Sequence, residues 1–194
     1  MLRIRMTATI AALLLVVIAG AADAAANPSA DQDSGPVEAE KTLVSPSPSD
    51  GSYYTVEVEE EPEESYTDID VLGKVTSYKC KVAKVAYTRH TLFGSVAYRF
   101  WMRRGWCWRY PRLVSVGTTT YVTDKDGLNE YDGIVSASGF WFQWCCNEPH
   151  SGHSAFRQGE FHNCIFRYGC LSTVYPWIRM KVRGNGTYTY SVGD

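Results

Sequence analysis

The charge of this 194-residue chain is divided into two opposite blocks, and that division limits which part can build a folded core. Residues 27–70 hold thirteen Asp and Glu side chains and one basic residue, Lys41, which gives a formal charge of −12. Residues 71–194 hold sixteen Lys and Arg against seven Asp and Glu, a formal charge of +9, and they also contain all six Trp and all seven Phe. The sequence therefore predicts an acidic segment without a core, followed by one basic, aromatic-rich domain at 71–194.

Residues 1–26 have the pattern of a secretory signal peptide. Arg3 and Arg5 precede an uncharged apolar run at 10–22, and small residues suited to cleavage follow at 22–26. The apolar run is shorter than the roughly 20 residues that a membrane-spanning helix needs. We therefore expect the signal to be cleaved and the protein to be secreted to the extracellular side, with no membrane span afterwards.

Residues 27–70 predict a disordered acidic linker. The segment contains five Pro with Ser, Asp and Glu between them, and the glutamate run at 57–64 repels itself. Two alternatives stay open. Residues 52–56 have the composition of a short strand, and the whole segment could fold back over the basic domain and mask it until proteolysis. A solubilising spacer is the simpler interpretation, and we favour it.

The basic domain is predicted to be all-β. Apolar and polar residues alternate, no stretch of ten residues has helical spacing, and turn residues separate the runs. Turns are expected at 103–105, 124–127, 131–133 and 185–186, where Gly can supply the positive φ that tight turns require. The expected strands are 75–88, 95–103, 106–117, 119–123, 134–146, 159–168, 176–183 and 187–192. This spacing predicts an antiparallel β-sandwich or a small barrel.

All the cysteines lie in the basic domain, and their number is even. A secreted protein with six cysteines is expected to form three disulfides, although the sequence cannot choose among the 15 possible pairings. Two of the cysteines are adjacent on an expected strand, so they should point to opposite faces and pair with different partners. The predicted disulfide residues are Cys80, Cys107, Cys145, Cys146, Cys164 and Cys170.

Two of the expected strands alternate between an apolar face and a basic face that carries one Trp. Arginine and lysine pair with phosphates or carboxylates, and a flat Trp ring offers a surface for sugars. The predicted ligand-binding residues are Arg99, Trp101, Arg103, Trp177, Arg179, Lys181 and Arg183. The expected function is a non-catalytic module that binds an anionic extracellular polymer, such as a cell-wall polymer or an acidic polysaccharide. Nucleic acid fits an exported protein less well. A purely structural alternative, in which these side chains only solvate an outer sheet face, uses the same pattern.

A small secreted hydrolase, nuclease-like in its chemistry, is the second functional hypothesis. Glu160 and His162 would share the proton transfer, and Arg157 or Arg167 would hold the anion. The histidines of the sequence His150-Ser151-Gly152-His153 have a spacing that metals can use, but an oxidising compartment favours disulfides over a zinc site. No catalytic motif is present, so we predict no catalytic residue, no metal and no cofactor.

The region at about 100–190 resembles a loose group of small secreted β-rich proteins from actinobacteria. The residues that carry the resemblance are Trp106-Cys107-Trp108, Gly159-Glu160-Phe161 with the cysteines that follow, and the stretch from Pro176 to Thr187. The resemblance implies a bacterial extracellular setting and a β fold. These positions are mainly structural, and the group has no assigned activity, so it implies no site residue.

Overall fold

The computed structural model describes residues 45–46, 52–69, 71–165 and 169–194. The chain separates into two units, 1–37 and 38–194, and all the described residues belong to the second. The predicted signal peptide and residues 27–44 and 47–51 of the predicted linker lie outside the described residues. The described residues form strands, turns and loops, and none of them builds a helix that could cross a membrane.

One antiparallel sheet, which we call sheet A, contains six strands among the described residues. Along it lie β1 (Ser45–Pro46), β2 (Tyr53–Glu60), β4 (Val75–His90), β5 (Val96–Arg109) and β6 (Arg112–Thr123). The strand β3 (Glu64–Ile69) pairs with β4 as well, beyond the end of β2.

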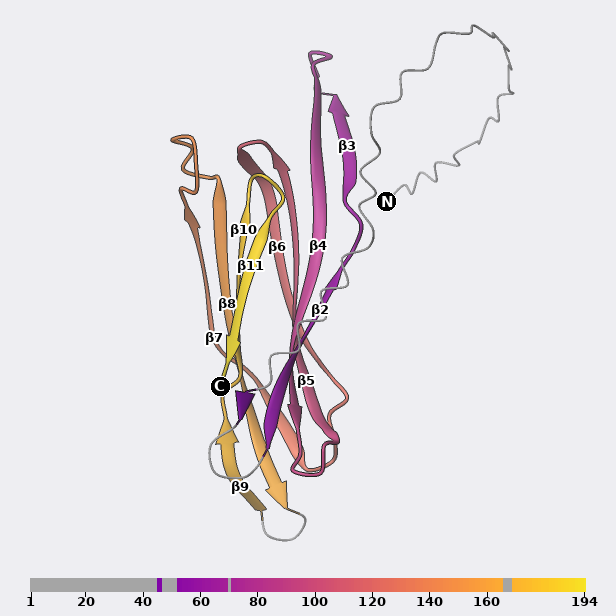
Figure 1. Ribbon diagram of the computed structural model, residues 1–194. Coiled ribbons are helices and arrows are strands. Elements are labelled where there is room, and N and C mark those ends of the chain that lie inside the picture. Colours follow the sequence, from indigo (N-terminus) through magenta and orange to yellow (C-terminus); the bar gives the residue numbers. More distant parts are fainter. Residues whose placement is uncertain (1–44, 47–51, 70, 166–168) are drawn as a thin grey trace, which may run out of the picture. The chain divides into compact units, whose positions relative to one another are not determined.

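The second antiparallel sheet, sheet B, contains five strands among the described residues. Its order is β11 (Tyr188–Gly193), β10 (Trp177–Arg183), β8 (Gly152–Ile165) and β7 (Asn129–Phe142), and β9 (Gly169–Val174) also pairs with β8. The strand β10 contacts β4 and β5, and β8 contacts β6, so the sheets pack face to face (Figure 1). The predicted all-β fold is confirmed, in its sandwich form.

The core lies between the two sheets and is built from alternate residues of the long strands. Sheet A contributes Tyr98, Phe100 and Met102 of β5, and sheet B contributes Ile178 and Met180 of β10, all fully buried. Because side chains alternate across a strand, the residues between them point away from the core. The predicted face assignment of both strands is therefore correct.

Three of the four predicted turns have a different role in the structure. The turn at 103–105 is wrong, because β5 runs without a break and Gly105 pairs with Val82 and Gly117. Residues 131–133 form a bulge inside β7 and not a turn, and 124–127 connects sheet A to sheet B. The hairpin at 185–186 is confirmed, with Gly186 at a φ of 84° between β10 and β11.

The predicted linker is wrong for residues 53–60 and 64–69, which form β2 and β3. The strand β2 pairs with β4 along its whole length, and Val56 is only 3% exposed in the core. Val56 and Val58 alternate with Glu57 and Glu59, so the segment has one apolar face to bury. Its charge does not prevent folding, because the basic residues of β4 and β5 pair with the glutamates.

Candidate functional site

The seven predicted ligand-binding residues lie on two different sheets. Arg99, Trp101 and Arg103 belong to β5 of sheet A, whereas the other four belong to β10 of sheet B. All seven alternate with core residues and so lie on the outer side of their own sheet. Because the sheets pack through their inner sides, the two outer faces point in opposite directions. The structure therefore does not bring the two sets together into one surface.

The cations on the outer face of sheet A are paired with acidic residues. The Nε–H of Arg99 donates to Glu57 at 2.9 Å, and Arg99 also pairs with Asp124. The hydrogen bond that Arg99 donates to Asp124 lowers the pKa of that carboxyl group. Farther along β5, Nη2 of Arg103 lies 3.6 Å from a carboxylate oxygen of Glu61. The acidic segment thus neutralises the very cations that were predicted to bind a ligand.

The remaining predicted residue of this face, Trp101, is packed into the sheet. It is 6% exposed, its ring stacks on Tyr121, and its indole N–H donates to Thr123 at 2.9 Å. Next to it on the sheet, Lys84 donates to Glu59 at 3.0 Å. Sheet A therefore presents neither an accessible Trp nor an uncompensated cation on this part of its outer face.

The outer face of sheet B has the opposite character. No carboxylate of the described residues lies within ion-pair distance of Arg179, Lys181 or Arg183. The guanidinium of Arg179 lies 5.2 Å from the centre of the Phe156 ring, and that of Arg183 lies 5.9 Å from the Trp144 ring. These stacking contacts hold the arginine side chains against the sheet and leave their charge uncompensated.

Trp177 completes this surface at the start of β10. Its ring centre lies 5.9 Å from that of Phe156, and the ring covers Gly193 so closely that a Cβ there would lie 2.8 Å from it. A polar hollow of about 190 Å³ lies beside it, lined by Arg179, Lys181, Thr189, Tyr190 and Ser191. We call this surface the basic face; it consists of Phe156, Trp177, Arg179, Lys181, Arg183, Thr189 and Ser191.

Glu160 and His162, the pair of the alternative hydrolase hypothesis, lie farther along β8, on the same outer side of sheet B. Phe161 is buried in the core, so Glu160 and His162 on either side of it point outward. Nε2 of His162 lies 3.6 Å from Oε1 of Glu160 and 3.3 Å from Oδ2 of Asp132. Glu160 and His162 were predicted from the sequence, but Asp132 was not, because its neighbours have the composition of a turn.

Arg157, one of the two arginines predicted for this pair, does not lie with it. Arg157 is paired in register with Ile178, whose side chain is in the core, so Arg157 is on the inner side of β8. Its Nη1 donates to the main-chain oxygens of Ser138 and Phe156. Arg167 lies outside the described residues. The carboxylate and the imidazole thus meet, but without Arg157.

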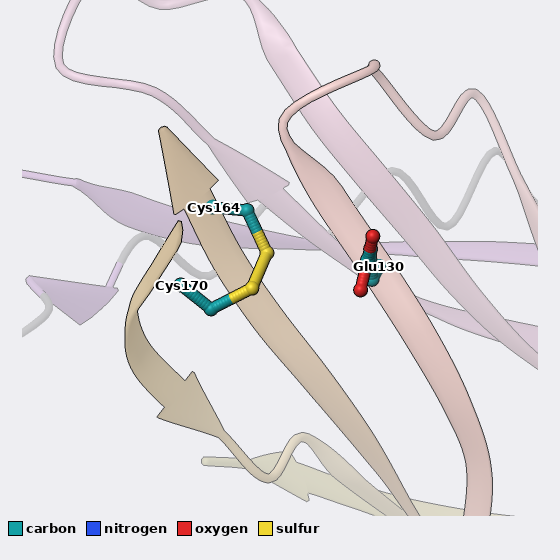
Figure 2. Close-up of side chains that lie close together, drawn as sticks. All are labelled: Glu130, Cys164 and Cys170. Carbon is teal, nitrogen blue, oxygen red and sulfur yellow. A yellow bond between two sulfur atoms is a disulfide. The ribbon is translucent and has the colours of Figure 1, made fainter. Parts of the chain in front are cut away.

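Four cysteines form two disulfides, each between neighbouring strands of one sheet. Cys80 and Cys107 join β4 to β5, and Cys164 and Cys170 join β8 to β9. Figure 2 shows Glu130 of β7 beside the second disulfide. Because the two sulfur atoms are bonded to each other, this group cannot supply thiolate ligands to a metal.

The other two cysteines, Cys145 and Cys146, are free thiols. They follow the end of β7 at Phe142, and Cys146 has a φ of 59°, so they do not lie on a strand with side chains on opposite faces. Hydrogen bonds from Cys145 and from Tyr110 lower the pKa of the exposed Cys146. The structure thus has two disulfides in place of the three predicted.

The histidines of residues 150–153 pack against an aromatic ring. The ring centres of His150 and His153 lie 5.1 and 4.7 Å from that of Trp141, both edge-on. Among the described residues, neither histidine belongs to a group of three potential metal ligands within reach of one another. The Asp132, Glu160 and His162 group does meet that condition.

Sequence reasoning missed the fully buried Arg104, because it assigned that residue to a turn. The guanidinium contacts Oγ1 of Thr118 and Nδ1 of His153. Burial, and then the charge of Arg157, lower the pKa of Arg104 to about 10, which still leaves it charged at pH 7. Burial, followed by Arg104 and Arg157, lowers the pKa of His153 to about 4, so this imidazole is neutral.

No protein-family model, no curated protein and no solved structure matches this chain. The geometry and chemistry of the chain itself give two candidate sites. These are the basic face and the outward-facing group of Asp132, Glu160 and His162.

Proposed function

We propose that this chain is a secreted, non-catalytic binding module that holds an anionic extracellular polymer on the basic face of sheet B. The observation that carries the proposal is the contrast between the two outer faces. On sheet A, Arg99, Arg103 and Lys84 are paired with glutamates, whereas on sheet B no described carboxylate pairs with Arg179 or Lys181.

The chemistry of the basic face fits a polymer that carries both charge and sugar rings. A guanidinium such as that of Arg179 binds phosphate or carboxylate oxygens with paired N–H groups. The hydroxyl groups of Thr189 and Ser191 border the same hollow and can bond to sugar hydroxyls. The ring of Trp177 supplies a flat apolar surface. Acidic polysaccharides and anionic cell-wall polymers combine these features.

The test compares two variants that each remove two positive charges. Arg179→Gln with Lys181→Gln changes the basic face, and Lys84→Gln with Arg103→Gln changes the outer face of sheet A. Binding to heparin and to a purified anionic wall polymer is measured by calorimetry over a range of salt concentrations. The basic-face variant should bind at least about tenfold more weakly and with a smaller salt dependence, because fewer counterions are released. The sheet A variant should stay within about twofold.

Equal weakening in both variants would mean that net charge, and not the basic face, determines binding. Binding that does not respond to salt would contradict the proposal outright. Trp177→Ala tests the aromatic part, and it should weaken binding to the polysaccharide without changing the salt dependence.

Hydrolysis is the second candidate function, and one observation favours it. Glu160 and His162 lie 3.6 Å apart on an outer face, close enough to share a proton with a bound substrate. Cleavage of single-stranded RNA by the full chain, lost in Glu160→Gln and in His162→Ala, would support this function. RNA that stays intact in the presence of the wild-type chain would contradict the hydrolase function.

A further inference from the structure

Asp132 owes its position to an irregularity in β7. Tyr131 pairs with Phe161 and Gly133 pairs with Glu160, so Asp132 is the extra residue of a bulge. Gly133 has a φ of 114°, a conformation that residues with a Cβ rarely adopt. Bulges of this kind redirect side chains and are common beside functional sites. This bulge directs the Asp132 carboxylate toward His162.

His162 is held in one orientation by the neighbouring strand. Thr173 of β9 is its direct partner in the register, and Thr173 Oγ1 lies 2.9 Å from Nδ1. When Nδ1 donates its proton to this hydroxyl, the lone pair of Nε2 points toward the two carboxylates. Metal-binding histidines are oriented in this way, by a hydrogen bond from the ring nitrogen that does not bind the metal.

The basic residues that the structure describes do not balance the charge at this point. Among the described residues, no Lys or Arg lies within ion-pair distance of Asp132 or Glu160, and the hydroxyl of Tyr175 is a further neutral contact at 3.3 Å from Glu160. Two ionised carboxylates carry a charge of −2. A divalent cation would balance that charge and would bind all three acceptor atoms at once.

The two separations that involve Nε2 of His162 are those of two ligands on one metal ion, and they are longer than a close ion pair. A protonated imidazole bonds to a carboxylate at about 2.7–2.9 Å. Here the two distances from Nε2 are 3.3 and 3.6 Å, and all three ligand atoms lie within 4.8 Å of one another. A tetrahedral zinc ion with bonds of about 2.0–2.2 Å separates its ligands by about 3.3–3.6 Å.

We propose that Asp132, Glu160 and His162 bind one Zn²⁺ ion, with a fourth position open to solvent. One imidazole and two carboxylates suit zinc, whereas calcium takes six to eight oxygen ligands. The exposed Asp132 carboxylate leaves the ion accessible from the outer side of sheet B. The site uses none of the residues of the basic face, so the zinc proposal and the polymer-binding proposal can fail independently.

The test is a zinc titration of the full, oxidised chain after removal of metal with EDTA, followed by calorimetry and by competition with a zinc-binding dye. One Zn²⁺ should bind per chain. Asp132→Asn, Glu160→Gln and His162→Ala should each weaken binding by at least about tenfold, and Thr173→Val by about 10- to 100-fold, because it releases the imidazole. Added Zn²⁺ should raise the Tm of the wild-type chain and not that of His162→Ala.

Matched controls address the other groups that attract zinc. His150→Ala removes an exposed imidazole that also lies near a carboxylate, and Cys145→Ser with Cys146→Ser removes both free thiols. Both should bind zinc within about twofold of the wild type. The Tm of each metal-free variant shows that it is folded, and Thr173→Val keeps all three ligands if His162→Ala does not fold.

Four results would overturn the proposal. The first is the absence of stoichiometric zinc binding by the wild-type chain. The second is unchanged affinity in His162→Ala, and the third is loss of binding in the cysteine variant. Binding of Ca²⁺ in preference to Zn²⁺ would also contradict it, because that preference requires an oxygen-rich site.

Discussion

Arg104 shows how a local signal and the tertiary structure can disagree at one residue. The sequence Arg103-Arg104-Gly105 has the composition of a turn, but the alternation of Tyr98, Phe100 and Met102 continues through it to Trp106. That longer pattern places Arg104 on the core side of β5, where it is fully buried. The apolar periodicity of the whole strand therefore predicts the position of Arg104 correctly, whereas the turn-like composition of residues 103–105 does not. The partner, His153 of another strand, could not be deduced, because sequence does not show which strands face each other across the core.

The stability of the protein should depend on pH through His153. Its folded pKa of about 4 lies below the unfolded value of about 6.5, so in this interval the unfolded chain binds a proton that the folded chain does not. The contribution is therefore complete above about pH 6.5 and is lost as the pH falls toward 4. We expect the free energy of unfolding to fall by about 1–2 kcal/mol over this range, a figure reduced for the partial exposure of the ring.

Denaturant unfolding between pH 7 and about 4 measures this loss. His153→Gln keeps an oxygen acceptor for Arg104 but cannot titrate, so its unfolding free energy should change less over the same interval. Carboxylates such as Asp124, whose pKa Arg99 lowers, act mainly below this range. Parallel pH curves for the variant and the wild type would contradict the assignment.

At the scale of the element, the acidic segment is highly charged and also has an apolar face, and its overall composition shows only the charge. Charge and proline content predict a chain that cannot bury a core, and this prediction is wrong for β2. The alternation of Val56 and Val58 with glutamates is the signal of a half-buried strand. Repulsion between the glutamates does not prevent β2 from folding, because Glu57 and Glu59 are paired with cations of the neighbouring strands.

If β2 is a structural strand, substitutions within it should affect stability according to their face. Val56→Ala removes buried methyl groups from the core and should lower the free energy of unfolding by about 2 kcal/mol. Glu59→Gln removes one side of a half-exposed ion pair with Lys84 and should cost less than about 1 kcal/mol. Chemical denaturation of both variants provides the comparison. A disordered tether would tolerate either substitution without a change, so a silent Val56→Ala would exclude the strand.

At the scale of the molecule, strand parity was predictable but the partnership of strands was not. The side chains of β5 and β10 that face the core were assigned correctly from alternation alone, and so was the all-β fold. Placing Arg99 and Arg179 on one surface required both strands to be in the same sheet, which local pattern does not determine. The strands belong to opposite layers, and each outer face therefore has its own charge. The position of Asp132 beside His162 could not be predicted for a related reason, because a bulge depends on the register between two strands.

The disulfides also act within layers, because neither of them joins sheet A to sheet B. The apolar core and polar contacts such as that between Arg104 and His153 hold the sheets together, and each disulfide should contribute mainly by restricting the unfolded chain. Cys80 and Cys107 are 27 residues apart, whereas Cys164 and Cys170 are 6 apart. Loop-closure entropy predicts losses of about 3.5 and about 2 kcal/mol when each pair is replaced by Ser. Denaturant unfolding should give that order, with the sandwich retained in both variants.

Alkylation of the native chain should label Cys145 and Cys146 before reduction, which establishes that the other four cysteines are bonded. A larger loss from the shorter loop would show that this disulfide contributes through the native structure around β9, and not through the entropy of the unfolded chain.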